Sequence, residues 1–232
     1  MSMLNWIVFD ADDTLLDFKG AQVQAFKRMM ESFGLEKDSD RYLEIYRRLN
    51  DGLWRALERG EIAKAELIER RFKDFCDYTG LDGLHEKMRF SYEEELSKRG
   101  ELVPGALEVC QKLSRDFSLA LASNGISYIQ KSRFARSGLD VFFKEVIISE
   151  ETGYEKPQKG FFDVMMGRIG EDDPQRILFI GDSLNSDMLG AVNYGLLSCW
   201  YNPEKKDTDL NIDYTLTSLE QIPALVESLV IY

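Results

Sequence analysis

The sequence has little positive charge and no long apolar run, and both shortages exclude classes of protein. It has 29 Lys and Arg against 41 Asp and Glu, so the formal net charge is −12. Nucleic acids and anionic membrane surfaces would be repelled by this charge, so we expect neither as a partner. No basic-then-apolar leader opens the chain, and no apolar run reaches the roughly 18 residues of a membrane span. We therefore expect a cytoplasmic protein.

Cysteine and histidine are also scarce. The three cysteines, Cys76, Cys110 and Cys199, are scattered, which argues against a disulfide framework or a metal cluster. Each stands beside apolar residues, which predicts buried free thiols. The single histidine, His85, is far from every motif described below, and we expect it at the surface or at the start of a helix.

The most informative stretch is an apolar run, Trp6 to Phe9, that ends at three carboxylates and Thr14. Such a run predicts a strand buried on both faces, with Asp10 at its C-terminal end, where open α/β sheets bind ligands. If the chain turns there, Asp10 and Asp12 can point into one pocket. Carboxylates this close repel one another unless a cation or a proton intervenes. The alternative is a polar turn that caps a following helix.

The rest of the chain divides into a helical insert and an α/β part. Apolar residues recur at helical spacing from about residue 21 to residue 97, and Gly34, Gly60, Gly80 and Gly83 punctuate this stretch. We expect about four antiparallel helices in residues 18–99, as a candidate lid, with a linker at 17–20. Residues 1–17 and 100–232 alternate apolar strands with helices, which predicts an α/β doubly wound parallel sheet. The later strands are expected at 118–123, 146–149, 177–180, 198–201 and 214–216.

Polar residues follow the ends of these expected strands. Ser123 and Asn124 could donate hydrogen bonds to a phosphate oxygen, and a proline after Lys156 would hold that lysine in an extended conformation. Asp182 and Asp187 follow the next strand. Taken singly, each has a simpler explanation: a loop turn, a solvated lysine, or Asp187 as a helix N-cap. Together they predict a site in which carboxylates hold Mg²⁺ and a hydroxyl and an ammonium bind phosphate.

Four motifs in this order, DADDT, SNG, the lysine of GYEKP, and GDSLNSD, resemble those of the haloacid dehalogenase (HAD) superfamily of phosphatases. The helical insert is similar to the C1-type cap domain of that superfamily. The resemblance implies a HAD-like Rossmann-type core in which Asp10 attacks phosphorus to give an aspartyl-phosphate. Asp12 would protonate the leaving oxygen and later deprotonate the hydrolytic water.

The same resemblance implies the remaining parts of the site. Mg²⁺ would be held by a carboxylate oxygen of Asp10, the backbone carbonyl of Asp12, and Asp182. Asp187 would act through a water or would orient the other ligands, and Thr14 would support the loop. The transferring phosphoryl group would be bound by Ser123, Asn124 and Lys156.

Two details of the first motif bear on the substrate. The acid at Asp12 favours hydrolysis of a phosphate monoester over cleavage of a carbon–halogen bond. Asp13 replaces the commoner glycine, and DDTLLDF resembles the subgroup of bacterial pyrimidine 5′-nucleotidases. We therefore expect a nucleoside 5′-monophosphate phosphatase, with the base selected by the cap and by Phe18 and Lys19.

Other functions remain open at this point. The same core and cap could serve a phosphatase of a sugar phosphate or of phosphoglycolate. A phosphomutase would return the phosphoryl group to a sugar instead of water. A non-catalytic binding module could also retain the fold, although every motif residue is present. The sequence does not predict the oligomeric state.

Overall fold

The computed structural model describes residues 4–230, and the chain divides into two compact units. The core unit comprises residues 1–18 and 100–232, and the helical unit comprises residues 19–99. The prediction of a linker at 17–20 is wrong, because helix α1 (Phe18–Ser32) starts at Phe18 and runs through Gly20. The apolar face of this helix continues without a break after Gly20, through buried Ala21, Ala25, Phe26, Met29 and Met30.

Within residues 4–230, six parallel strands form one sheet of the core unit in the order β3-β2-β1-β4-β5-β6. Strand β1 pairs with β2 on one side and with β4 on the other, so the order reverses at β1. Ligands of doubly wound sheets bind at such a switch point. The predicted fold class is confirmed. The strands are β1 (Trp6–Phe9), β2 (Ser118–Ser123), β3 (Phe143–Ile148), β4 (Ile177–Gly181), β5 (Leu197–Tyr201) and β6 (Tyr214–Leu216).

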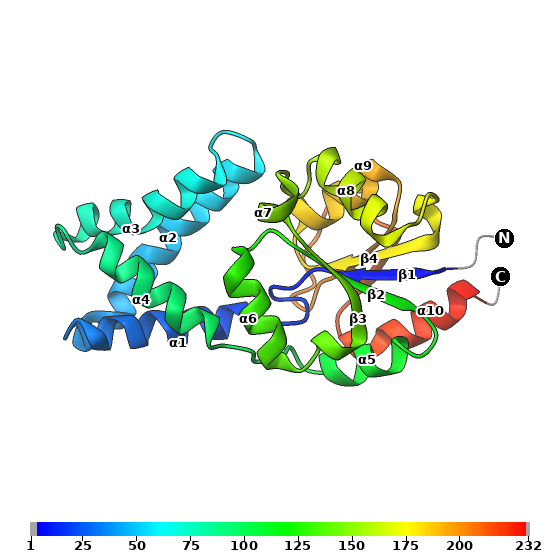
Figure 1. The fold of residues 1–232 in the computed structure, drawn as a ribbon, viewed down its shortest axis with the longest axis horizontal. Coiled ribbons are helices and arrows are strands. Elements are labelled where there is room, and N and C mark those ends of the chain that lie inside the picture. The colour runs from blue at the N-terminus through cyan, green and yellow to red at the C-terminus, as the bar shows by residue number, and fades with distance from the viewer. Residues whose placement is uncertain (1–3, 231–232) are drawn as a thin grey trace. The chain divides into compact units, whose positions relative to one another are not determined.

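Helices cover both faces of this sheet (Figure 1). Helices α5 (Ala106–Leu113) and α10 (Ile222–Val230) pack with Ile7 and Phe9 of β1, whereas α8 (Lys159–Ile169) and α9 (Leu189–Tyr194) pack with Val8. Burial on both faces explains why the strands are continuously apolar. Helices α6 (Ser127–Ser137) and α7 (Ser149–Thr152) follow β2 and β3. Shorter helical segments lie at Glu36–Asp38, Asp140–Phe142, Pro174–Arg176, Leu184–Met188 and Leu219–Gln221.

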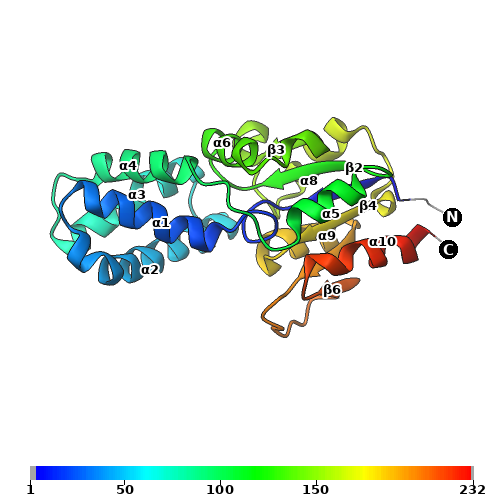
Figure 2. The ribbon, with the colours of Figure 1, turned by 90° about the horizontal axis from the view of Figure 1, so that it is seen from below.

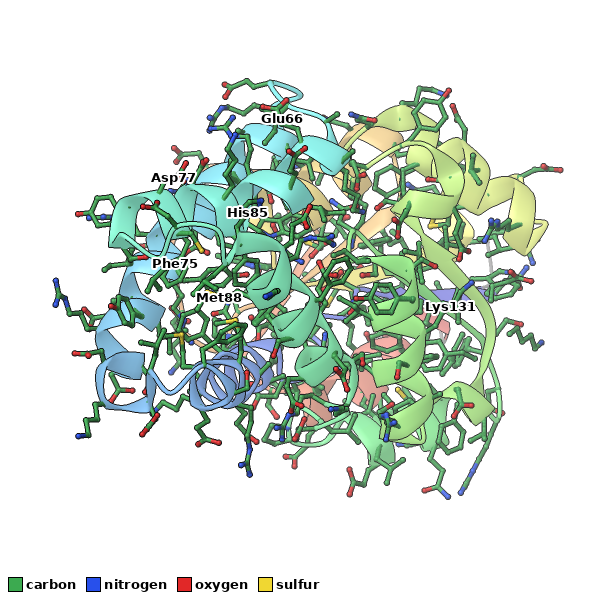
Figure 3. The ribbon with its side chains drawn as sticks, turned by 60° about the vertical axis from the view of Figure 1, so that its left-hand side comes forward. Glu66, Phe75, Asp77, His85, Met88 and Lys131 are labelled. Atoms are coloured by element: carbon green, nitrogen blue, oxygen red, sulfur yellow. The ribbon has the colours of Figure 1, made fainter. Side chains whose placement is uncertain are left out.

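The helical unit consists of α1, α2 (Ser39–Glu58), α3 (Lys64–Thr79) and α4 (His85–Ser97), as Figure 2 shows. His85 therefore starts a helix, as expected. The interior of the unit is aromatic: Tyr46 lies 4.9 Å from Phe72 and 5.4 Å from Tyr92, measured between ring centroids. Phe75 and Met88 are buried in this interior, whereas Glu66 and Asp77 are exposed (Figure 3).

All three cysteines are free and buried, which confirms that prediction. Among residues 4–230 we find no helix with the length and hydropathy needed to span a lipid bilayer.

Candidate active site

The loop after β1 turns sharply and places Asp10 at the end of the strand. The backbone N–H of Asp10 donates to the carbonyl of Ile180 on β4 at 2.8 Å, which continues the strand pairing. The N–H groups of Leu15 and Leu16 both donate back to the carbonyl of Ala11, at 3.0 and 2.8 Å. Asp13 has a left-handed backbone, with φ of 58°. That conformation explains why glycine would suit this position and why an aspartate, which tolerates it better than most residues, can replace it.

Lys156 joins two carboxylates at the centre of the site. Its ammonium donates to Asp10 Oδ1 at 2.6 Å, to Asp187 Oδ1 at 2.7 Å and to the carbonyl of Ala122 at 2.7 Å. These bonds use all three ammonium protons, which is what a fully buried lysine requires. Lys156 is thus a fixed cation, as its place before Pro157 predicts.

The charges in this cluster shift one another's protonation. Burial, and after it the neighbouring charge of Asp187, raises the pKa of Asp10 well above its ordinary value, although Lys156 acts in the opposite direction. Burial alone would lower the pKa of Lys156, but the carboxylates of Asp10 and Asp187 raise it above its ordinary value. The ammonium is therefore charged at neutral pH, and it favours the ionised form of Asp10.

Asp10, Asp182 and Asp187 each place a carboxylate oxygen within 4.8 Å of the other two. A site in which all the available ligand atoms are carboxylate oxygens suits a hard divalent cation such as Mg²⁺. Gly181 is needed here, because a Cβ at this position would lie 2.4 Å from Asp187 Oδ2. The indole N–H of Trp200 donates to the carbonyl of Asp182 at 2.9 Å and fixes the backbone of that residue.

The structure corrects the alternative role considered for Asp187. The N-cap of the following helical segment is Ser183, whose hydroxyl accepts from the N–H of Ser186 at 3.3 Å. Asp187 lies inside that segment, and its carboxylate accepts from Lys156 and, at 3.1 Å, from the N–H of Ser183. Its carboxylate faces the Asp10 cluster, so a role as a helix cap is excluded.

Ser123 and Asn124 follow β2, as expected, but their side chains differ in what they can do. Both polar atoms of the Asn124 amide bond the backbone of Lys156: Nδ2 donates to its carbonyl at 2.9 Å and Oδ1 accepts from its N–H at 2.8 Å. Asn124 therefore positions Lys156, and its contact with phosphate stays a prediction. The Ser123 hydroxyl accepts from Gly125 N–H at 3.0 Å and from Gln130 Nε2 at 2.8 Å, which leaves its own proton to donate.

Two side chains that the sequence analysis missed, Gln130 and Arg133 on α6, contact Asp12. Gln130 Nε2 donates to Asp12 Oδ2 at 2.9 Å, and an Nη1 proton of Arg133 is donated to Asp12 Oδ1. The sequence did contain one sign of these two residues, namely their position on an otherwise apolar face of a helix. In α6, both fall on the buried face that carries the apolar Ile129 and Phe134, where a glutamine and an arginine are unusual.

Thr14 is fully buried, as a loop-supporting residue would be. Its hydroxyl has no hydrogen-bond partner among residues 4–230. The supporting role of Thr14 therefore stays a prediction.

Comparison with known proteins identifies the family. Residues 4–195 match the sequence model of the haloacid dehalogenase-like hydrolases. The chain belongs to this family. It is therefore an enzyme, a hydrolase, as the four motifs predict.

Similar proteins agree with the predicted subgroup. The HAD hydrolase YfnB of Bacillus subtilis is 33% identical, over 96% of this chain and 95% of its own length. The pyrimidine 5′-nucleotidase PynA of Streptococcus pneumoniae is 35% identical, over 85% and 84%. The pyrimidine 5′-nucleotidase YjjG of Escherichia coli is 29% identical, over 96% and 97%. A crystal structure of YfnB bound to magnesium superposes with a TM-score of 0.89, over 96% of this chain and 98% of YfnB. The resemblance to the pyrimidine 5′-nucleotidase-like subgroup is confirmed.

Proposed function

We propose that this hydrolase is a magnesium-dependent phosphatase of nucleoside 5′-monophosphates that acts through an aspartyl-phosphate. The observation that carries the proposal is the buried cluster of Asp10, Lys156 and Asp187 at the switch point of the sheet. The two nucleotidases among its relatives support the substrate class. The YfnB structure, which contains magnesium, supports the choice of metal.

Asp10 is the proposed nucleophile. One of its carboxylate oxygens would form a bond to phosphorus while the bond from phosphorus to the ester oxygen breaks, and water would then hydrolyse the aspartyl-phosphate. Lys156 keeps a positive charge 2.6 Å from Asp10 Oδ1, which lowers the repulsion between this carboxylate and an incoming phosphate. Asp10, Asp182 and the backbone carbonyl of Asp12 would hold Mg²⁺, and Asp187, whose two oxygens accept from Lys156 and Ser183, would act through a water or orient the other ligands. The bound ion would stabilise the negative charge of the phosphate oxygens.

Asp12 is the proposed acid and base. Its carboxyl group would give a proton to the leaving ester oxygen in the first step, and its carboxylate would take a proton from water in the second. The Ser123 hydroxyl would donate to a phosphoryl oxygen, since both hydrogen bonds that it accepts leave that proton available. Lys156 would stabilise the phosphoryl group through its charge, because its three ammonium protons are already donated to protein oxygens. Asn124 would hold the backbone of Lys156 in place.

The test is the release of phosphate from p-nitrophenyl phosphate and from a panel of nucleoside monophosphates, sugar phosphates and phosphoglycolate. Each is incubated with the protein in Mg²⁺ and in EDTA. We expect magnesium-dependent turnover that favours pyrimidine nucleotides such as dUMP, dTMP or UMP. Preference for a sugar phosphate or phosphoglycolate would keep the mechanism and overturn the substrate. No release from any substrate would contradict phosphatase function and favour a mutase or a binding module.

Asp10→Asn tests the nucleophile, because the amide keeps the size of the side chain and cannot attack phosphorus. We expect turnover to fall by roughly 10⁴-fold or more. The matched control is Asp116→Asn, an exposed aspartate that precedes β2 at the opposite end of the sheet. Unchanged activity in folded Asp10→Asn protein would refute the mechanism.

A further inference from the structure

We propose that Gln130 and Arg133 of α6 are positioning residues that hold the Asp12 carboxylate in the orientation needed for proton transfer to the leaving group. This inference rests on the proposed phosphatase function, in which Asp12 is the acid and base. It concerns two residues outside the four motifs.

The contacts form a closed ring. Gln130 Nε2 donates to Asp12 Oδ2 at 2.9 Å, Arg133 Nη1 donates to Asp12 Oδ1, and Arg133 Nη1 also donates to Gln130 Oε1 at 3.0 Å. Each carboxylate oxygen of Asp12 thus has its own donor, so rotation of the carboxylate would break at least one of these bonds. Gln130 and Arg133 are separated by three residues on one helix, which places them on the same face.

Gln130 also connects the acid and base to the proposed phosphate site. The second proton of its Nε2 is donated to Ser123 Oγ at 2.8 Å, so one amide spans Asp12 and Ser123. Gly125 makes room for this amide, because a Cβ there would lie 2.3 Å from Gln130 Cγ and 2.9 Å from Nε2. The backbone of Gly125 is not left-handed. The glycine after Ser123 and Asn124 is therefore required by the Gln130 side chain and not by a special turn.

The solvent exposure of the three side chains shows which of them can touch a substrate and which can only position another residue. The side chain of Arg133 is 0% exposed and Gln130 is buried, whereas the Asp12 side chain is 29% exposed. Only the carboxylate can meet a substrate. Because a buried guanidinium is strongly disfavoured without a carboxylate beside it, Arg133 favours the orientation of Asp12 that the structure shows.

Helix α6 is itself held in place near the site. At its start, the N–H of Ser127 donates to Glu150 Oε2 and the hydroxyl of Ser127 donates to Glu151 Oε1, both at 2.6 Å. The guanidinium carbon of Arg133 lies 5.5 Å from the ring centroid of Phe18, which covers it. Lys131, between the two positioning residues in sequence, is exposed on another side of the helix (Figure 3). The ring of contacts is therefore built on a fixed element.

The experiment compares two leaving groups. A nucleoside alkoxide needs a proton from Asp12 to leave, whereas p-nitrophenolate is stable without one, and kcat/KM reports the step in which the leaving group departs. For Arg133→Met we expect kcat/KM for a nucleoside monophosphate to fall roughly 10²-fold, while kcat/KM for p-nitrophenyl phosphate falls less than about fivefold. Asp12→Asn should show the same discrimination in kcat/KM.

Three further variants keep the test decisive. Arg136→Met, which replaces an exposed arginine of the same helix, should leave both rates unchanged. Gln130→Leu and Gly125→Ala should discriminate in the same direction as Arg133→Met, and they decide the matter if Arg133→Met fails to fold. Circular dichroism and the melting temperature establish which variants are folded.

Equal losses for both leaving groups in the folded variants would overturn the positioning role, because a general loss of structure or of phosphate binding does not depend on the leaving group. A wild-type protein that releases phosphate from neither substrate would instead refute the proposed function, and the inference with it. The two failures are therefore distinguishable by the wild-type rates.

Discussion

Each unit of the molecule contains a buried arginine paired with a carboxylate, and the two pairs differ in the solvent exposure of the carboxylate. In the helical unit Arg71 donates to Glu93 at 2.5 Å, and the side chains are 4% and 3% exposed. In the core unit Arg133 pairs with Asp12, and the side chains are 0% and 29% exposed. In the Arg71–Glu93 pair both side chains are shielded from solvent, and we call it the closed pair. In the Arg133–Asp12 pair the carboxylate is accessible to solvent, and we call it the open pair. A buried arginine alone therefore does not mark a functional site, but the exposure of its partner separates a pair that stabilises the fold from one available for chemistry.

The closed pair has the additional contacts that a buried ion pair needs. Glu93 also accepts from Arg89 Nη1 at 3.2 Å, and the guanidinium of Arg71 lies 5.7 and 5.6 Å from the ring centroids of Phe72 and Tyr92. Desolvation makes such a pair costly to form, and removal of one partner leaves a buried charge that costs more. We therefore assign the Arg71–Glu93 pair to the stability of the helical unit.

Of the changes that separate the two pairs, the largest expected effect is on activity, from Asp12→Asn. The amide keeps the size of the side chain but cannot donate and accept a proton, so we expect kcat for a nucleoside monophosphate to fall by about 10² to 10⁴-fold. This change also removes the carboxylate charge beside the buried guanidinium of Arg133, so we expect the free energy of unfolding, from urea titration, to fall by up to about 3 kcal/mol. A variant that loses stability and keeps its activity would reverse the assignment of the two pairs.

Glu93→Gln should lower stability and leave activity unchanged. Loss of this charge leaves Arg71 buried without its partner, and we expect the free energy of unfolding to fall by about 3 kcal/mol while kcat of the folded protein is retained. The control is Glu94→Gln, because Glu94 is 70% exposed and pairs with the exposed Lys98 at the end of the same helix. Its effect should stay below about 1 kcal/mol. Similar losses in the two variants would show that burial of the Arg71 pair contributes nothing particular.

The cysteines can show where Glu93→Gln acts. Burial raises the pKa of Cys76, in the helical unit, to about 11, and that of Cys110 and Cys199, in the core unit, to about 12. At about pH 8 the reactive thiolate is therefore much scarcer than in a free cysteine, and alkylation requires local opening. We expect mass spectrometry to show faster alkylation of Cys76 in Glu93→Gln, with unchanged rates at the other two cysteines. Equal acceleration at all three would mean that the two units open together.

The sequence predicted those parts of the molecule in which one local pattern decides the structure. The apolar run that ends at Asp10 predicted a buried strand that ends among carboxylates, and the proline after Lys156 predicted a fixed cation. The wrong prediction of a linker at 17–20 also came from a local pattern that ends at Gly20. The burial of the apolar face of α1 outweighs the modest free-energy cost of a glycine in a helix.

What the sequence could not predict depends on contacts between distant residues. Gln130 and Arg133 are 118 and 121 residues from Asp12, and no local pattern joins them to it. Likewise Asn124 has donors and acceptors that suit a phosphate, and only the structure shows that its amide is bonded to the backbone of Lys156. A resemblance to a family identifies motif residues, but it does not say which neighbouring side chains hold them.

The smallest expected effect comes from Asp13→Gly, one residue from Asp12 on the same loop. Glycine relieves the left-handed backbone at φ of 58° but gives the unfolded chain more freedom, and the two effects oppose each other. We expect the free energy of unfolding to change by less than about 1 kcal/mol, and kcat to stay within about twofold of the wild-type value. Asp13→Asn, which keeps a residue that tolerates this conformation, is the control for the lost charge. If Asp13→Gly lowered kcat as far as Asp12→Asn, the activity would depend on the charge or shape of the loop as a whole, and the open Arg133–Asp12 pair would lose its special role.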